Sequence, residues 1–528
     1  MSLSGDLLRL ADAVLFPGFT GHTPPDWLRR RLGAGLAGVA LFSRNIAGPG
    51  QLARLTAELR AENPSVLIGT DEESGEVTRL EVATGSSRPG GYALGVVDDV
   101  RLTEALARDL GHDLARAGIT IDFAPSADVN SNPDNPVIGL RAFGADPSLV
   151  ARHTRAFVRG LQSAGVAATA KHFPGHGDTT VDSHHGVPVV AESGIQDALH
   201  PFREAIDEGV KVIMTGHLLV PSYDAERPAT LSPKVLTGLL REELGFDGLI
   251  ITDGIEMAAV SEAYGIGGAS ARALAAGADA ICVGGEHADE ATADGVRDAI
   301  ATAVTTGLLP EERLADAARR VRELAGWAAS SGSRGHSDGG TGLDSPRHSD
   351  GGTGLEAARH SDGGVGLEAA RHSDGGVGLE AARRAVRVTR HSTAPVLPIG
   401  PAPHVVELAP EMNLAIDKAT PWGVGEPLAR LRPGTTVTRL AAGSATGAEL
   451  DRLLVLAADR PLVVVVRDAH RHPWQAEALR HLLGARPDAV VVEMGLPVRS
   501  DLGGVHIATY GSARVCGQAA AEVLTGSL

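Results

Sequence analysis

Cysteine is almost absent from this chain of 528 residues, which contains only Cys282 and Cys516. The two lie far apart in sequence, and Cys282 belongs to the apolar run at residues 280–283, a pattern typical of a protein interior. Both are therefore predicted to be buried thiols rather than a disulfide. A disulfide-stapled scaffold is excluded, and nothing in the cysteine usage requires an oxidising compartment.

Basic residues, aromatic residues and long apolar runs are also scarce. Lysine and arginine number 48 against 65 aspartates and glutamates, and aromatic residues make up 3% of the chain. This acidic balance argues against a general attraction for nucleic acid or anionic lipid, so a neutral or small substrate fits better. No apolar stretch is long enough to span a membrane. Residues 1–16 lack the basic segment and apolar run of a secretory signal, so we expect a cytoplasmic protein.

Short β-branched runs, each followed by a helical pattern rich in Ala, Leu and Arg, recur from residue 1 to about residue 330. These repeated units predict a (β/α)8, TIM-like barrel at residues 1–330, whose active site lies on the loops after the carboxyl ends of the strands. The length of the chain also predicts a second domain. The candidate strands are residues 13–16, 38–42, 66–70, 120–123, 166–170, 212–214, 249–252 and 280–283.

Residues 331–384 form a Gly-rich repeat with a period of about twelve residues, one copy of which is 371–382. Its glycine density predicts a linker, although the last copy favours a helix through Arg384. Residues 385–528 again alternate apolar runs, such as 462–466, with helical patterns, and predict a smaller α/β sandwich domain. This domain shows no catalytic constellation, so we expect it to pack, to support loops or to dimerise.

The densest group of ionisable residues directly follows the candidate strand at 166–170. Packed in a core, such groups would repel or desolvate one another, whereas at a barrel mouth they can face a polar ligand. We therefore predict a functional site here rather than a solvated loop. The group consists of Lys171, His172, His176, Asp178, Asp182, His184 and His185.

Polar residues follow other predicted strands too. Asp253 comes after the run 249–252, where it either points into the barrel mouth or caps the next helix. Asp71 follows another strand and can accept hydrogen bonds from sugar hydroxyls. Arg141 offers a planar fork to a carbonyl or a hydroxyl cluster. Each is a weak signal alone, because aspartates and arginines at strand ends often pair with each other.

Together, these segments make residues 1–330 resemble glycoside hydrolase family 3, and in particular its β-N-acetylglucosaminidase (β-N-acetylhexosaminidase) branch. Lys-His-Phe-Pro-Gly-His-Gly-Asp-Thr at 171–179, followed by Asp-Ser-His at 182–184, is nearly identical to the motif of that branch. Other branches usually take their acid/base from a glutamate in the second domain. One departure, Glu-Ser-Gly-Glu at 73–76 where the family commonly has Glu-Gly-Gly-Arg, bears on subsite shape and substrate range.

The resemblance implies a role for each candidate residue. Asp253 corresponds to the catalytic nucleophile, His184 to the acid/base, and Asp182 to the carboxylate that orients it. It implies a retaining mechanism through a covalent glycosyl-enzyme, with no cofactor and no metal ion. The positions that correspond to sugar contacts are Asp71, Arg79, Arg141, Lys171 and His172.

The expected activity is removal of terminal β-linked N-acetylglucosamine from a small glycoside or a muropeptide-type sugar, as in cell-wall recycling, with chitin-derived oligosaccharides as the alternative source. No nucleic-acid or membrane partner is expected, and the sequence does not predict an oligomeric state. Phosphorolysis stays open, because a histidine acid/base is neutral after the leaving group departs and repels an anionic acceptor less than a glutamate. A β-glucosidase-like specificity also stays open.

Three other classes of protein remain as alternatives. The histidines and aspartates of 171–185 could ligate a metal ion for hydrolysis, although their spacing matches no usual zinc motif. Lys171, at a strand end, could form a Schiff base in a barrel lyase. A non-catalytic sugar-binding protein would keep the same contacts without turnover.

Overall fold

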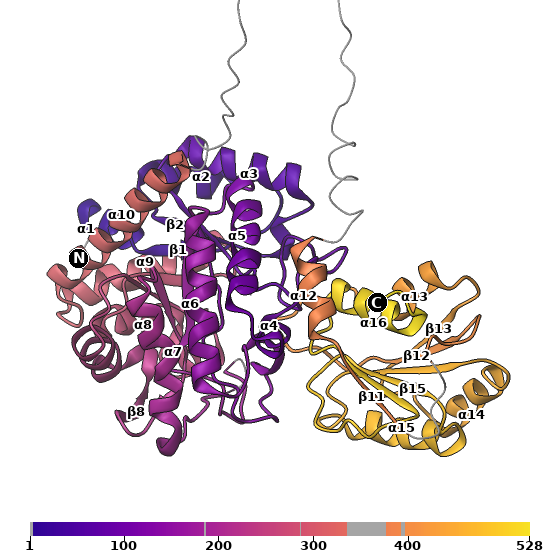
Figure 1. Cartoon of the computed structure of the whole chain (residues 1–528). Coiled ribbons are helices and arrows are strands. Elements are labelled where there is room, and N and C mark those ends of the chain that lie inside the picture. Colours follow the sequence, from indigo (N-terminus) through magenta and orange to yellow (C-terminus); the bar gives the residue numbers. More distant parts are fainter. Residues whose placement is uncertain (1–3, 184–185, 286, 335–375, 392–396) are drawn as a thin grey trace, which may run out of the picture.

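The computed structural model describes residues 4–183, 186–285, 287–334, 376–391 and 397–528. A larger domain, coloured indigo to salmon in Figure 1, lies beside a smaller one, coloured orange to yellow, and α12 lies where they meet. Within the described residues, no helix combines the length and apolar character needed to cross a lipid bilayer. The predicted state of the two cysteines is confirmed, since both are buried free thiols.

The larger domain is built on eight parallel strands. Six form one sheet in the order β2-β3-β4-β5-β6-β9, β1 pairs with β10, and a bridge between Ile251 and Ala280 connects β9 to the start of β10. Each predicted strand overlaps one of these, which confirms the (β/α)8-like barrel. Their bounds are β1 Leu15–Pro17, β2 Gly38–Leu41, β3 Leu67–Thr70, β4 Ile121–Asp122, β5 Ala167–Phe173, β6 Val212–Thr215, β9 Leu249–Thr252 and β10 Ile281–Val283.

β5 extends further than the predicted run at 166–170, because it includes Lys171, His172 and Phe173. The register with β6 shifts between Ala170 and Phe173, and Lys171 makes a bridge to the loop after β4. Strand pairing thus continues into the polar residues, which the change in hydropathy had suggested to be loop. Lys171 and His172 are consequently held by main-chain hydrogen bonds rather than on a free loop.

Side chains of the strands fill the barrel interior, and glycines in the strands make room for aromatic rings. A Cβ on Gly38 would overlap the ring of Phe16, and one on Gly69 would overlap the ring of Phe123. The strands are apolar runs buried on both faces, for example β2, β3 and β9, as is typical of parallel sheets covered by helices. The barrel interior is therefore a packed core, and the site must lie at its mouth.

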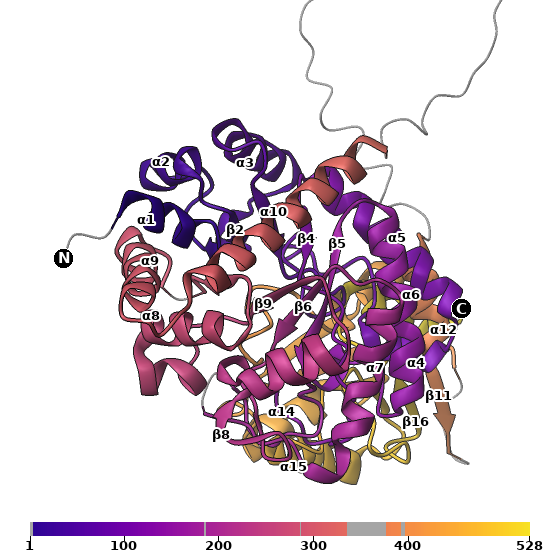
Figure 2. The same ribbon diagram turned by 90° about the vertical axis from the view of Figure 1, so that its left-hand side faces the viewer.

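Helices surround the strands (Figure 2). Several begin with an aspartate N-cap, as at Asp99, Asp146 and Asp289, whose side chains accept hydrogen bonds from the first-turn main-chain N–H groups. A short hairpin, β7 Leu219–Val220 with β8 Asp224–Pro228, precedes the π-helix Lys234–Glu243. The α-helices are α1 Gly5–Asp12, α2 Asp26–Ala34, α3 Pro49–Glu62, α4 Gly91–Val97, α5 Val100–Arg116, α6 Pro147–Ser163, α7 Ile195–Asp207, α8 Ala258–Ala276, α9 Glu290–Thr305 and α10 Glu311–Arg334.

The smaller domain is a six-stranded sheet in the order β11-β16-β15-β14-β12-β13, parallel except for β11. Separate apolar clusters cover its two faces, one with α13 and α16 and the other with α14 and α15, which confirms the predicted α/β sandwich. The bounds are β11 Arg387–Arg390, β12 His404–Leu408, α13 Gly425–Leu431, β13 Thr436–Leu440, α14 Gly447–Leu456, β14 Leu462–Val466, α15 Pro473–Ala485, β15 Val490–Glu493, β16 Val505–Ala508 and α16 Arg514–Thr525.

The last repeat copy forms α12, Val377–Ala385, which packs between the two domains. Leu379 joins the core of the smaller domain and Ala381 the core of the barrel domain. A Cβ on Gly378 would overlap the carbonyl oxygen of Ser87, so the close approach to the barrel requires glycine. The earlier copies lie outside the described residues, and the predicted domain limits at 331 and 384 stay predictions.

Candidate active site

Four predicted sugar-contacting residues belong to one charged network at the carboxyl ends of β3 and β5. Lys171 Nζ lies 2.7 Å from Asp71 Oδ1 and 2.7 Å from Glu73 Oε1, both on the loop after β3. Glu73 also accepts two hydrogen bonds from Arg141, at 2.8 Å from Nε and 2.7 Å from Nη2. Arg79 approaches Asp71 from another side, with Nη2 3.8 Å from Oδ2. The fold therefore brings together residues that are up to 100 positions apart in sequence.

Glu73 connects this network, and sequence reasoning gave it no role. The side chains of Glu73, Lys171 and Arg141 are all less than a tenth exposed. Burial alone would raise the pKa of Glu73, but Arg141 and Lys171 outweigh it and hold this pKa well below its ordinary value. The only signal in the sequence was its place in the acidic run after β3.

The same network bears on the Schiff-base alternative. Burial alone would lower the pKa of Lys171, but the charges of Asp71 and Glu73 reverse the effect and raise it. Only an unprotonated amine is a nucleophile, so catalytic lysines of this kind need a lowered pKa. The surroundings of Lys171 suit a hydrogen-bond donor to a substrate and disfavour a lyase.

His172, the fifth predicted sugar contact, is oriented by Asp128 on the loop after β4. His172 Nδ1 lies 2.8 Å from Asp128 Oδ2, and Nε2 lies 3.3 Å from Arg141 Nη2. Burial would raise the pKa of Asp128, but His172 and His176 lower it, so the carboxylate is ionised and accepts the Nδ1 proton. Nε2 of the same ring faces Arg141, whose guanidinium can only donate hydrogen bonds.

Asp253 directly follows β9, and the structure decides between its two predicted positions. α8 begins at Ala258 with Met257 as its N-cap residue, so Asp253 does not cap that helix. Asp253 Oδ1 accepts a hydrogen bond from its neighbour, Gly254 N, at 2.8 Å. The carboxylate is therefore placed at the strand end, where an active-site residue of a barrel would lie.

Cys282 on β10 is a buried thiol whose pKa responds to charged groups of the candidate site. Burial raises the pKa of its thiol well above the ordinary value, and the negative charges of Glu256, Asp71 and Asp253 raise it further. The positive charge of Lys171 acts on the thiol in the opposite direction. Asp71 and Asp253 directly follow β3 and β9, and Lys171 lies near the end of β5, so all three lie at the carboxyl end of the same parallel sheet.

The loop after β5 is fixed by the loop after β4. Asn135 Nδ2 donates to the carbonyl oxygens of His176 at 2.8 Å and Thr179 at 3.1 Å, while His176 Nδ1 lies 2.6 Å from Thr179 Oγ1. Burial lowers the pKa of His176 to about 4, so its ring is neutral and supports the loop. Asp182 is buried in this loop. His184 lies outside the described residues, so the Asp182–His184 pair stays a prediction.

The metal alternative finds little support in the described part of the loop. Among all described residues, no three His, Cys, Asp or Glu side chains are arranged to hold a metal ion. His172 and His176 each engage Nδ1 in a hydrogen bond inside the protein. Those ring atoms serve the protein scaffold.

Loops of the smaller domain contact the barrel loop that carries the site. The carbonyl oxygen of Ala415 accepts a hydrogen bond of 3.1 Å from Arg79 Nη2. Ser512 donates its main-chain N–H and its hydroxyl to Glu76 Oε1, at 2.5 and 3.1 Å. Glu76 ends the segment that departs from the family pattern, and it meets two donors from the other domain. These contacts support a loop-supporting role for that domain.

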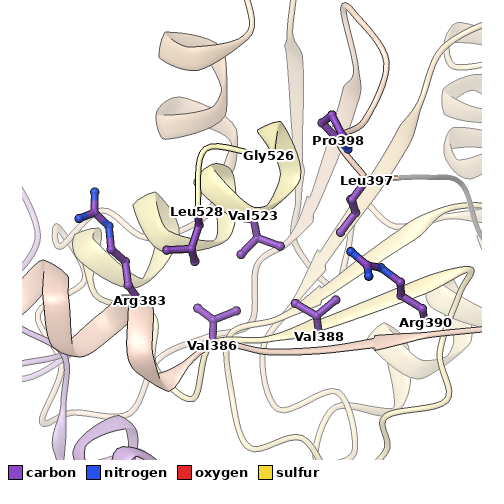
Figure 3. Close-up of a pocket in the computed structure, with 9 residues that line it drawn as sticks. All are labelled: Arg383, Val386, Val388, Arg390, Leu397, Pro398, Val523, Gly526 and Leu528. Atoms are coloured by element: carbon purple, nitrogen blue, oxygen red, sulfur yellow. The ribbon is translucent and has the colours of Figure 1, made fainter.

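A pocket of about 300 Å³ lies away from the barrel mouth, in the smaller domain between β11 and α16 (Figure 3). It contains none of the predicted site residues, and two arginines line it together with apolar side chains. It is therefore separate from the candidate active site. Its lining consists of Arg383, Val386, Val388, Arg390, Leu397, Pro398, Val523, Gly526 and Leu528.

Residues 29–324, more than half of the chain, match the N-terminal domain of glycosyl hydrolase family 3. The chain belongs to glycosyl hydrolase family 3. Beta-hexosaminidase A of Pseudoalteromonas piscicida is 34% identical over 317 residues, which cover 55% of this family 3 chain and 53% of that protein. A beta-hexosaminidase of Stenotrophomonas maltophilia strain K279a is 38% identical over 268 residues, 49% of this chain and 78% of that protein. The chain spans about half the length of the first of these relatives.

Solved structures of family 3 cover the whole chain. A family 3 beta-N-acetylglucosaminidase from Paenibacillus sp. str. FPU-7 is 33% identical, with a TM-score of 0.83 over 100% of this chain and 97% of that one. A beta-glucoside phosphorylase, at 19% identity and a TM-score of 0.74, shares the fold. The resemblance predicted from residues 171–184 is confirmed at the level of family and fold.

Proposed function

We propose that this protein is a retaining β-N-acetylhexosaminidase that releases terminal β-linked N-acetylglucosamine. The observation that carries the proposal is the network of Lys171, Asp71, Glu73 and Arg141 at the mouth of the barrel, at the same end of the parallel sheet as Asp253. Its donors and acceptors alternate at hydrogen-bond distance, which suits the hydroxyl groups of a sugar. The relatives named beta-hexosaminidase support an N-acetylated sugar as the part that is released.

The mechanism that follows uses the carboxylate at the end of β9. Asp253 attacks the anomeric carbon while His184 protonates the departing oxygen, which gives a covalent glycosyl-enzyme. His184 then takes a proton from water, which displaces Asp253, and the two inversions retain the β configuration. Asp182, two residues from His184, stabilises its protonated form and fixes its tautomer.

The substrate that we propose is a small glycoside of the muropeptide type, hydrolysed in the cytoplasm during cell-wall recycling. The acidic balance of the chain supports a substrate other than a nucleic acid. Two buried free thiols are compatible with a reducing compartment.

The test measures p-nitrophenol released from its β-N-acetylglucosaminide and its β-glucoside, with and without phosphate. We expect turnover of the glucosaminide and a loss of about 10³-fold or more in Asp253→Ala, since the nucleophile is removed. Asp197→Ala, at an exposed position on α7, is the control and keeps full activity. Strong acceleration by phosphate with a sugar-1-phosphate product would replace hydrolysis by phosphorolysis. No turnover of either glycoside would overturn the proposal.

A further inference from the structure

His217 is a buried histidine at the barrel mouth to which the proposed mechanism gives no part. It lies two residues beyond the end of β6, and its side chain is fully buried. The residue before it, Gly216, packs against the site, since a Cβ there would lie 3.2 Å from the Cβ of His172. In the sheet, β6 lies between β5 and β9. His217 therefore follows the strand that separates a proposed sugar contact from the proposed nucleophile.

The turn that carries the nucleophile is held by main-chain hydrogen bonds from two strands. Asp253 N–H donates to the carbonyl oxygen of Thr215, at the end of β6, at 3.2 Å. Ile255 N–H donates to the carbonyl oxygen of Cys282, on β10, at 3.0 Å. Gly254 lies between these two anchors, and the main chain of a glycine is conformationally permissive. The orientation of its carbonyl group therefore depends on the hydrogen bonds that this group accepts.

His217 supplies one of those hydrogen bonds. Its Nε2 lies 3.0 Å from the carbonyl oxygen of Gly254, which also accepts a hydrogen bond of 3.0 Å from Met257 N–H. A carbonyl oxygen only accepts, so Nε2 carries the proton. Nδ1 lies 2.8 Å from Oγ1 of Thr230, which is itself 2.7 Å from Oγ1 of Thr215. The ring is thus held at both nitrogens, which fixes its orientation toward Gly254.

The same glycine contacts the carboxylate of the nucleophile. Gly254 N–H donates to Asp253 Oδ1 at 2.8 Å, while the carbonyl oxygen of Gly254 accepts from His217. A rotation of Gly254 that breaks the bond to His217 therefore also moves the donor away from the carboxylate. Attack requires the reacting atoms about 3–3.5 Å apart and aligned, and a displacement of about 1 Å costs roughly a hundredfold in rate.

We propose that His217 is a positioning residue for the nucleophile, which acts by donating from Nε2 to the carbonyl oxygen of Gly254. The inference rests on the proposed function and adds to it a residue that works through the turn rather than on the sugar. The proposed sugar contacts lie on β5 and on the loops after β3 and β4. Loss of His217 is therefore expected to slow formation of the glycosyl-enzyme and to leave binding of the sugar nearly unchanged.

The test uses 5-fluoro-N-acetyl-β-glucosaminyl fluoride, which labels the nucleophile of a retaining enzyme. Asp253 attacks the anomeric carbon, the C–F bond breaks, and fluoride leaves with the electron pair, so this step needs no acid from His184. Intact-protein mass spectrometry gives the maximal labelling rate and the half-saturating concentration separately. We expect His217→Phe, which keeps a ring without nitrogens, to label about ten- to a hundredfold more slowly, with the half-saturating concentration changed less than about twofold.

His153 on α6 provides a matched control. It is also fully buried, with Nδ1 2.8 Å from Thr103 Oγ1 and Nε2 3.2 Å from Asp98 Oδ1. His153→Phe therefore removes a similar pair of hydrogen bonds from the same domain. We expect it to lower the melting temperature about as much as His217→Phe does and to label at the wild-type rate.

His217→Gln separates the hydrogen bond from the ring, because its amide can donate near the position of Nε2. We expect it to recover most of the labelling rate that phenylalanine loses. The role of His217 would be overturned by unchanged labelling of His217→Phe, by an equal loss in the glutamine variant, or by an equal loss in His153→Phe. A wild type that is not labelled at all would instead contradict the proposed covalent mechanism, and this inference with it.

Discussion

Glu73 neutralises two buried cations at once, Lys171 and Arg141. Glutamine would keep its shape but remove its charge, and breaking a buried ion pair costs about 3–5 kcal/mol. We expect Glu73→Gln to lower the melting temperature by about 5–10 °C and kcat/KM by about a hundredfold, because the sugar-contacting residues lose their positions. Glu323→Gln, at an exposed position on α10, is the control for both measurements. An unchanged melting temperature would contradict this, and would mean that water replaces the lost carboxylate as the partner of Lys171 and Arg141.

Glu72, the neighbour of Glu73, is also buried, but its pKa is raised where that of Glu73 is lowered. Burial raises its pKa from 4.5 to about 7, against the hydrogen bonds it accepts from the main-chain N–H groups of Leu80 and Arg79. Between these two pH values the folded protein keeps a proton that the unfolded chain has lost, so stability falls as the pH rises through this window. We expect Glu72→Gln to flatten the melting temperature between about pH 5 and 7 relative to the wild type. Parallel curves for the two proteins would show that Glu72 is ionised when folded.

Residues that come directly off strand ends were predictable as candidates, whereas their partners were not. Asp71, Lys171 and Asp253 stand out because each is a charged residue after an apolar run. Asp128 and Asn135 lie in a long irregular stretch after β4, and their roles depend on which loop packs beside them. That packing is set by the closure of the barrel, which residue spacing does not encode.

Among the elements, α12 depends on a single glycine for its docking. A Cβ on Gly378 would overlap the carbonyl oxygen of Ser87, and main chain yields less readily than a flexible side chain. We expect Gly378→Ala to destabilise the protein by about 1–3 kcal/mol and to expose α12 to proteolysis. Gly376→Ala is the matched control, because a Cβ there meets nothing within 4 Å. Equal stability of the two variants would contradict this docking.

The strands were the most predictable elements, because parallel strands buried on both faces give continuous apolar runs. The end of β5 was not predictable in this way, because its strand continues through the polar residues Lys171 and His172 into the site. For α12 the repeat predicted only a helix through Arg384. Its place between the domains follows from the fit of Gly378 against Ser87, and sequence periodicity carries no information about that contact.

Across the whole molecule, the two domains are joined by contacts that include the buried carboxylate of Glu76 with Ser512. Alanine at this position leaves the Ser512 N–H without its acceptor, which costs about 1–3 kcal/mol. We expect Glu76→Ala to lower the calorimetric transition temperature and to raise KM, because the loop that carries Arg79 loses a support. Glu380→Ala, at an exposed position on α12, is the control. A lowered transition temperature with unchanged KM would limit Glu76 to a structural role.

The docked α12 is one member of a series of near-identical units. Gly-Leu-Glu-Ala-Ala-Arg occurs again at 354–359 and at 366–371. The sequence that contacts the barrel through α12 is therefore present in two further copies. Recombination that adds or deletes a whole unit would leave the docking sequence unchanged. Lengthening a connection of this size by one unit costs only roughly 0.2 kcal/mol in loop closure. Copy number can therefore drift between closely related strains under little selection, while the terminal unit stays fixed by its glycine.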